Sequence, residues 1–116
     1  MIDYKAIISK YCAGNTELQH ILLTHSRQVA DRALTILAAH PEWVESGEVD
    51  PVFVEEAAML HDIGVVLCDA PKIHCLGTHA YIEHGYLGAE ILRQEGLPKH
   101  AQVAERHTGT GITYEQ

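Results

Sequence analysis

The sequence predicts an all-α fold, a single domain over residues 1–116 in which about five helices form a bundle. Apolar residues recur at helical spacing along nearly the whole chain, and no run of alternating β-branched residues is long enough to build a sheet. Glycine and proline divide the chain into segments of helical length, and 116 residues suffice to close one hydrophobic core.

The first two helices have clear boundary signals. We expect one helix over about residues 3–11, which stops near the glycine of YCAG. A long second helix begins at Asn15 or Thr16, because TELQ has the Thr-x-x-Gln form of a capping box, and it ends before Pro41. The stretch PEWVESGEVD that starts there is expected to be a loop.

The third helix carries a strong start signal, the cap Asp50 followed by the first-turn proline Pro51. It is predicted to run to about Ile63 and to end at Gly64. Residues 65–79 contain proline, glycine and mixed polarity, which favours a loop.

The last two helices are separated by a glycine and a proline. A fourth helix is predicted over about residues 80–95, ending at Gly96. Pro98 opens a fifth helix that is expected to run to about His107, where the glycines of HTGTG break it.

The charge balance excludes some partners. Eight basic and 16 acidic residues give a formal charge of −8, with no cluster of Lys and Arg, so we expect neither nucleic acid nor a membrane surface as partner. No apolar run reaches the roughly 20 residues of a membrane span, and the N-terminus lacks the order of a signal peptide, so a cytoplasmic protein is expected. A homodimer is compatible with the sequence.

The three cysteines, Cys12, Cys68 and Cys75, are an odd number at spacings that match no zinc motif. Without an export signal they are most simply reduced thiols. Cys68 or Cys75 near a functional site is the less favoured alternative, because a free cysteine usually behaves as a small buried hydrophobe.

Nine histidines are the one oddity of the composition, exceeding Lys and Arg together. Helical spacing places four of them on apolar faces of four different helices, so that each is expected to face the core, and Asp62 follows one of them directly. The four are His25, His61, His84 and His107. His25 shares its stripe with residues that include Leu22 and Ile36.

Two interpretations compete for these four histidines. A lone histidine on an apolar face is usually a core residue hydrogen-bonded to a neighbour. A core this small cannot readily supply separate partners for four imidazoles and a carboxylate, whereas one or two cations satisfy them together. Imidazole and carboxylate ligands suit divalent Fe, Mn, Co, Ni or Zn better than Ca or Mg.

The other histidines are assigned by position. His20, His40 and His100 are expected on the surface, and His74 and His79 lie in the predicted 65–79 loop, where they are candidates for contacting a substrate.

These residues resemble a known family. His25, the His61-Asp62 pair within MLHDIG, and the later segments EHGYLGAEILRQEGLP and ERHTGTGI are similar to the HD-domain superfamily of metal-dependent phosphohydrolases, in its HDIG branch, over about residues 15–112. The resemblance implies a helical HD fold in which His25, His61 and Asp62 bind a first metal. It further implies that Asp62 bridges to a second metal held by His84 and His107, with His61 and Asp62 as catalytic residues.

One departure from the family pattern concerns the first metal. HD domains usually complete its coordination with an aspartate from a later helix, and no aspartate follows His107 here. Asp69 comes too early and Glu115 lies in an expected tail. We therefore expect the sequence to be shortened relative to a longer protein; the alternative is that water, substrate or a neighbouring subunit fills the position.

The leading functional hypothesis is a metal-dependent phosphohydrolase, with one or two metal ions, that acts on a nucleotide or another small phosphate ester through an activated water. His79, Lys72, Arg27 and Arg106 are candidates for contacting the substrate. The alternatives are a di-iron oxygenase of the HD type and a module that senses a metal or nucleotide without turnover.

Overall fold

The computed structural model describes the backbone of residues 2–113 and the side chains of 2–75 and 77–107. Within these ranges the all-α prediction is confirmed. The α-helices are α1 (Tyr4–Cys12), α2 (Thr16–Ala38), α3 (Pro41–Glu45), α4 (Pro51–Leu60), α5 (His84–Gln94) and α6 (Pro98–Thr113). Between α4 and α5 lie the 3-10 helices η1 (Ile63–Leu67), η2 (Pro71–Ile73) and η3 (Tyr81–Glu83) and the antiparallel strands β1 (Asp69–Ala70) and β2 (Cys75–Leu76).

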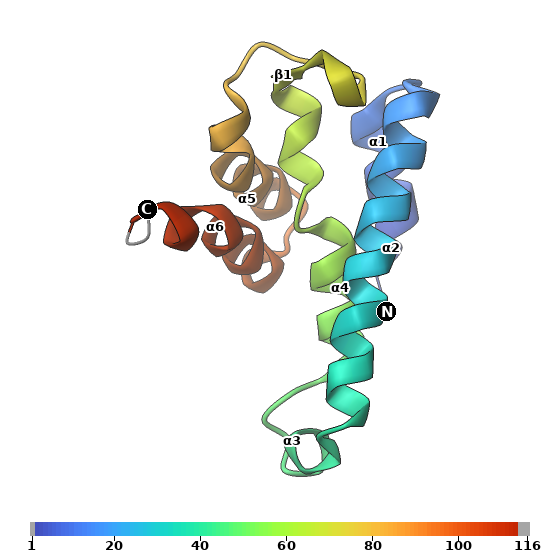
Figure 1. Ribbon diagram of the computed structural model, residues 1–116, viewed down its shortest axis with the longest axis vertical. Helices are drawn as coiled ribbons and strands as arrows, with labels where there is room; N and C mark the ends of the chain where they lie inside the picture. Colours follow the sequence, from blue (N-terminus) through green and yellow to red (C-terminus); the bar gives the residue numbers. More distant parts are fainter. Residues whose placement is uncertain (1, 114–116) are drawn as a thin grey trace.

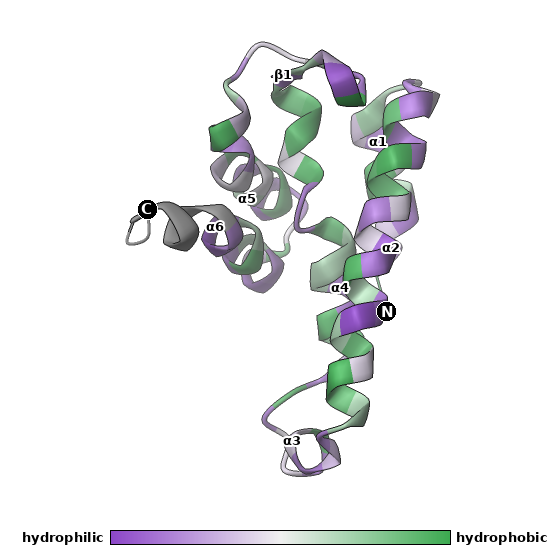
Figure 2. Cartoon of the chain, in the orientation of Figure 1, coloured by the Kyte–Doolittle hydropathy of each residue, from purple (hydrophilic) through white to green (hydrophobic). Residues whose placement is uncertain are grey.

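The helices pack as two pairs joined by η1. The helices α2 and α4 lie side by side, α5 packs against α6, and η1 packs against α5 (Figure 1). Figure 2 shows η1 and most of α4 as hydrophobic, as expected for the segments between the two pairs. The largest fully buried side chains at this junction include Met59, Leu60, Ile63 and Leu92.

The predicted helix starts are confirmed by their caps. The side chain of Asp3 accepts a hydrogen bond from the amide of Ala6 at 3.0 Å, and that of Asp50 accepts one from Val52 at 3.0 Å. Asn15, rather than Thr16, caps α2 by accepting from the amide of Leu18. Each cap satisfies an amide that the helix itself leaves unpaired.

Several boundaries differ from the predictions. The fourth helix, expected over about residues 80–95, begins as α5 only at His84, because residues 81–83 form the 3-10 helix η3. The segment 65–79, expected to be a loop, contains most of η1, all of η2 and the short strands β1 and β2. Residues 41–45, expected in a loop, form the short helix α3, which the first-turn proline Pro41 favours. The helix α4 ends at Leu60 rather than Ile63, so that His61 and Asp62 stand in a turn between two helices. The helix α6 continues to Thr113, because glycine within a helix costs only about 1 kcal/mol and does not have to end it.

Candidate metal centre

The turn after α4 presents two polar side chains at the junction of the helix pairs. His61 is the C-cap of α4 and Asp62 precedes η1, and both are buried, with exposed fractions of 9% and 8%. The chain can turn here because η1 restarts immediately in the tighter 3-10 geometry.

Gly64 explains how this turn reaches α5. A Cβ at this position would lie 1.9 Å from the carbonyl oxygen of His84 and 2.5 Å from the amide nitrogen of Gly88. Only glycine therefore allows η1 to touch the backbone of α5. The glycine was predicted to end the third helix, but its role in the structure is this close approach, which fixes the first residue of α5 beside Asp62.

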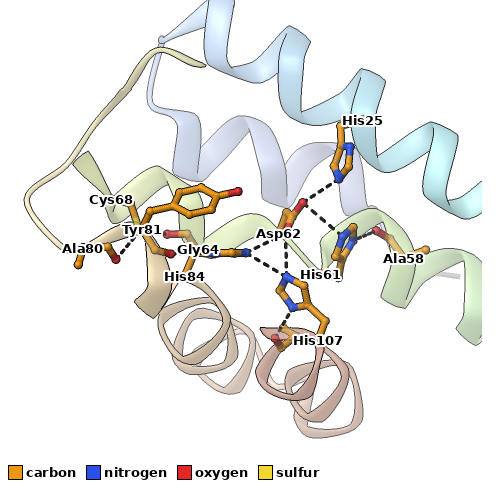
Figure 3. A network of polar contacts seen from close by, with 11 residues as sticks. His25, Ala58, His61, Asp62, Gly64, Cys68, Ala80, Tyr81, His84 and His107 are labelled. Atoms are coloured by element: carbon orange, nitrogen blue, oxygen red, sulfur yellow. Dashed lines mark hydrogen bonds and ion pairs between the residues drawn. The ribbon is translucent and has the colours of Figure 1, made fainter. Parts of the chain in front are cut away.

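The carboxylate of Asp62 is the centre of a cluster of four imidazoles (Figure 3). Its Oδ2 lies 3.0 Å from Nε2 of His25 and 3.3 Å from Nε2 of His61. Its Oδ1 lies 3.2 Å from Nε2 of His84 and 2.9 Å from Nε2 of His107. Each oxygen of the carboxylate thus faces a different pair of histidines. His25 and His61 come from the α2–α4 side, and His84 and His107 come from the α5–α6 side.

Backbone carbonyls orient three of these rings. A carbonyl oxygen can only accept, so the Nδ1 atoms of His61, His84 and His107 must carry the hydrogen and donate it. The acceptors are the carbonyls of Ala58, Tyr81 and Ala104, at 2.6, 2.7 and 2.5 Å. Each ring in its neutral form therefore turns an unprotonated Nε2 toward Asp62, which is the orientation of a histidine metal ligand.

The nitrogen atoms themselves indicate that a cation belongs here. Nε2 of His84 and Nε2 of His107 lie only 3.0 Å apart, and two lone pairs cannot bond each other. Protonating every ring would gather several positive charges around one largely buried carboxylate, at a large desolvation cost. Metal ions satisfy the same lone pairs without protons, so the donor set fits divalent metals.

The pKa shifts in the cluster reflect the negative charge of Asp62. Burial alone would raise the pKa of Asp62, but its contacts with three imidazoles outweigh burial and hold that pKa well below its usual range. Burial alone would lower the pKa of His61 and His84, and contact with the Asp62 carboxylate outweighs it and raises both. The carboxylate is therefore ionised and gives the site a negative centre.

Two groups of three residues each offer ligand atoms within 4.8 Å of one another. They are His25, His61 and Asp62, and Asp62, His84 and His107. The structure thus brings together all five of the residues expected to bind metal, in the two sets that the resemblance implied, with Asp62 common to both.

The two sides of the cluster differ in exposure. The side chain of His84 is 8% exposed, whereas that of His25 is 53% exposed. The prediction that His25 faces the core is therefore wrong in part: its ring reaches Asp62 from the rim of an opening, and Ile36, placed in the same stripe, is 49% exposed. The buried stripe of α2 consists of Leu18, Leu22, Ser26, Ala30 and Leu37.

A pocket of about 230 Å³ lies on this open side and shares His25 and Asp62 with the cluster. The sequence interpretation missed its wall residues, among them Ile73 and Tyr81. One signal was available for Tyr81, since it precedes His84 by three residues and so lies on the same helical face. The ring centroids of Tyr81 and His84 are 4.5 Å apart.

None of the four residues proposed to contact substrate lines this pocket. The guanidinium of Arg27 bonds Glu55 and Asp31, both at 3.0 Å. Lys72, His79 and Arg106 are exposed. A role for any of the four in substrate binding stays a prediction.

His100 was expected on the surface and is instead 9% exposed. Its Nε2 lies 3.0 Å from Oε1 of Glu56, and the other oxygen of Glu56 accepts from the amide of Ile2. The signal for burial was its spacing of one heptad from His107 on the same helical face. His20 is exposed, as expected, and His40 stacks on Trp43 with ring centroids 3.9 Å apart.

The remaining expectations concern the cysteines and the missing aspartate. Cys12, Cys68 and Cys75 are free and buried, and none belongs to either metal-binding group. Asp69 lies exposed in β1, also outside both groups. Glu115 lies outside the described residues.

Comparison with known proteins identifies one family. The model of the HD domain family matches residues 22–116. The chain is 47% identical over 112 residues to an uncharacterized protein of Methanocaldococcus jannaschii, MJ0778, an alignment covering 96% of this chain and 55% of that protein. The chain therefore spans about half the length of this curated relative. No solved structure matches. None of the helices that the structure describes combines the length and apolar character needed to cross a membrane.

Proposed function

This chain belongs to the HD domain family, and we propose that it is a phosphohydrolase that uses two divalent transition-metal ions to hydrolyse a small phosphate ester, such as a nucleotide. The family generally includes metal-dependent phosphohydrolases. The observation that supports the proposal most directly is the division of the Asp62 carboxylate, whose two oxygens each face a separate pair of imidazole nitrogens. Such a division suits a bridge between two metals.

The proposed ligands follow from the distances. Oδ2 of Asp62 with His25 and His61 would hold one ion, and Oδ1 with His84 and His107 the other. Divalent ions bound there supply charge that holds phosphoryl oxygens and lowers the pKa of a water molecule. In the reaction, water forms a new bond to phosphorus, the bond from phosphorus to the alcohol oxygen breaks, and the alcohol leaves with the proton that water gives up.

The chain's own residues orient the ligand rings and determine from which side the centre can be reached. The backbone carbonyls that accept from the Nδ1 atoms fix the rings before any ligand arrives, so little ordering is left to be done on binding. His61 and His84 are buried at the centre. The half-exposed His25 leaves its own side of the centre open to substrate.

The first test is elemental analysis of protein purified without chelators. We expect about two transition-metal ions per chain in the parent and about one in His84→Ala and in His107→Ala. His20→Ala removes an exposed imidazole outside both groups and is expected to keep the parent content. A parent chain that binds no transition metal under any loading condition would show the proposal to be wrong.

A screen for activity separates the alternatives. Hydrolysis of phosphate esters that proceeds equally with and without oxygen supports the proposal. Iron-specific turnover that requires oxygen would indicate the di-iron oxygenase instead. Metal or nucleotide binding without release of phosphate from any ester would indicate the sensing module.

A further inference from the structure

The pocket beside the candidate metal centre has a largely apolar lining. Besides His25 and Asp62, its walls come from α2, η1, η2 and η3 and are almost entirely hydrocarbon. The wall residues are Leu18, Ile21, Leu22, Val65, Ile73 and Tyr81. An aromatic ring and five aliphatic side chains therefore face whatever group extends from the metal centre on its open side.

No lysine or arginine lines this pocket among the residues that the structure describes. A phosphate group placed in it would lose its hydration without gaining a positive partner, which is costly. We therefore expect the charged end of a substrate to bind at the metal centre, where cations held by the negative cluster would receive it. The apolar pocket is left for an uncharged part of the same molecule.

The size of the pocket limits that part. About 230 Å³ is below the roughly 300–1,000 Å³ typical of sites for drug-sized ligands. An apolar cavity of about 150 Å³ holds benzene. The pocket can accordingly enclose one aromatic ring with small substituents, or a branched hydrocarbon of similar size.

Contacts outside the pocket hold its walls in place. Nδ2 of Asn15, the residue that caps α2, donates to the carbonyl of His74 at 2.7 Å and ties the end of η2 to the start of α2. This contact secures Ile73, the residue before His74. On the other wall the ring of Tyr81 packs against the ring of His84. The pocket is thus preformed, which lowers the cost of filling it.

From this juxtaposition we infer that the pocket holds the alcohol portion of a phosphate monoester, and that this portion is uncharged, apolar and about the size of one aromatic ring. The inference rests on the proposed function and narrows its substrate class. Tyr81 supplies an aromatic face for stacking, and Ile21 and Ile73 supply the aliphatic walls. An ester with a small polar alcohol would leave these walls unfilled, and one with a further charged group would not fit.

The test compares two phosphonates that cannot be hydrolysed, phenylphosphonate and methylphosphonate, in titration calorimetry against the metal-containing protein. We expect phenylphosphonate to bind at least about tenfold more tightly, because its ring removes additional apolar surface from water. Ile21→Trp fills the pocket and is expected to abolish this difference. The matched control is Ile82→Trp, since Ile82 is 60% exposed and lies outside the pocket wall.

A second pocket variant provides the same test if Ile21→Trp does not fold. Ile73→Gln places an amide in the wall of a short surface helix and is expected to weaken phenylphosphonate selectively. Equal affinity of the parent for the two phosphonates would overturn the inference, as would a higher kcat/KM for adenosine monophosphate than for phenyl phosphate. If phosphate esters are hydrolysed without this preference, the proposed function stands and the pocket assignment is wrong. If no ester is hydrolysed and neither phosphonate binds, both are wrong.

Discussion

Replacing Gly64 by alanine tests how closely the metal centre depends on backbone packing. The added Cβ would meet the carbonyl oxygen of His84 at 1.9 Å, about 1.5 Å short of ordinary contact at 3.4 Å. Neither atom belongs to a flexible side chain, so η1 or the start of α5 must move. Overpacking costs about 1–3 kcal/mol when side chains can adjust. We expect Gly64→Ala to lower the free energy of unfolding by about 3 kcal/mol or more, the upper end of this range.

The assay is urea unfolding of parent and variant, supported by thermal melting, where about 3 kcal/mol corresponds to a fall in Tm of about 10 °C or more. Gly88→Ala is the matched control on the other side of the same contact. Its Cβ would lie 3.0 Å from the amide nitrogen of Gly64, a shortfall of only about 0.4 Å from 3.4 Å. Alanine is also about 1 kcal/mol more favourable than glycine in a helix interior. We therefore expect the free energy of unfolding of Gly88→Ala to be close to that of the parent.

The same substitution makes a second prediction about the centre itself. His84 is the residue whose carbonyl is displaced, and its Nε2 lies 3.2 Å from Asp62. A shift of α5 by about 1.5 Å would separate them, so Gly64→Ala is expected to lose metal from the group containing His84. A variant that unfolds within about 0.5 kcal/mol of the parent and keeps its metal content would refute the packing argument.

Three further predictions address other parts of the molecule. His100→Ala is expected to destabilise the protein by about 3 kcal/mol in urea unfolding, because Oε1 of the buried Glu56 loses its partner. The exposed His20→Ala is expected to change the free energy of unfolding by less than about 0.5 kcal/mol. Burial raises the pKa of Cys75 from 9.0 to about 11, so the folded state keeps the thiol proton longer than the unfolded state. The free energy of unfolding of the parent is accordingly expected to fall, relative to that of Cys75→Ala, by about 2 kcal/mol as pH rises from 9 to 11, and a flat difference across that range would contradict this. Removing bound metal with a chelator is expected to lower unfolding free energy by about 3 kcal/mol, if the metal was present at about 100 times its Kd.

Features decided by neighbouring residues were predictable from the sequence. The caps Asp3, Asn15 and Asp50 bond amides two or three residues away, so a short stretch of sequence contains both partners. Helical periodicity depends only on spacing and correctly placed His61 and His84 in the interior, whereas its placement of His25 was wrong in part. The grouping of the five metal-binding candidates came from the family resemblance, and the geometry agrees with it.

Features decided by distant partners could not be predicted in the same way. Gly64 has the sequence context of a helix stop, and only the approach of α5 reveals why a glycine is needed. The partner of His100 is Glu56, 44 residues earlier, so its burial depends on how α4 meets α6. The exposure of His25 likewise depends on the opening that α2, η1 and η3 leave between them.

The position of Asp62 at the meeting point of the two helix pairs makes it a non-covalent cross-link of the chain. Its carboxylate closes a loop of 45 residues to His107, and shorter loops to His25 and His84. Closing such loops costs chain entropy, and the isolated helix pairs cannot assemble the full set of contacts. The proposed second ion, with ligands from Asp62, His84 and His107, would therefore bind only after the α5–α6 pair has docked against the turn that follows α4. Binding of that ion and the last step of folding would then be one equilibrium, and the occupancy of its site would report how much of the chain is completely folded.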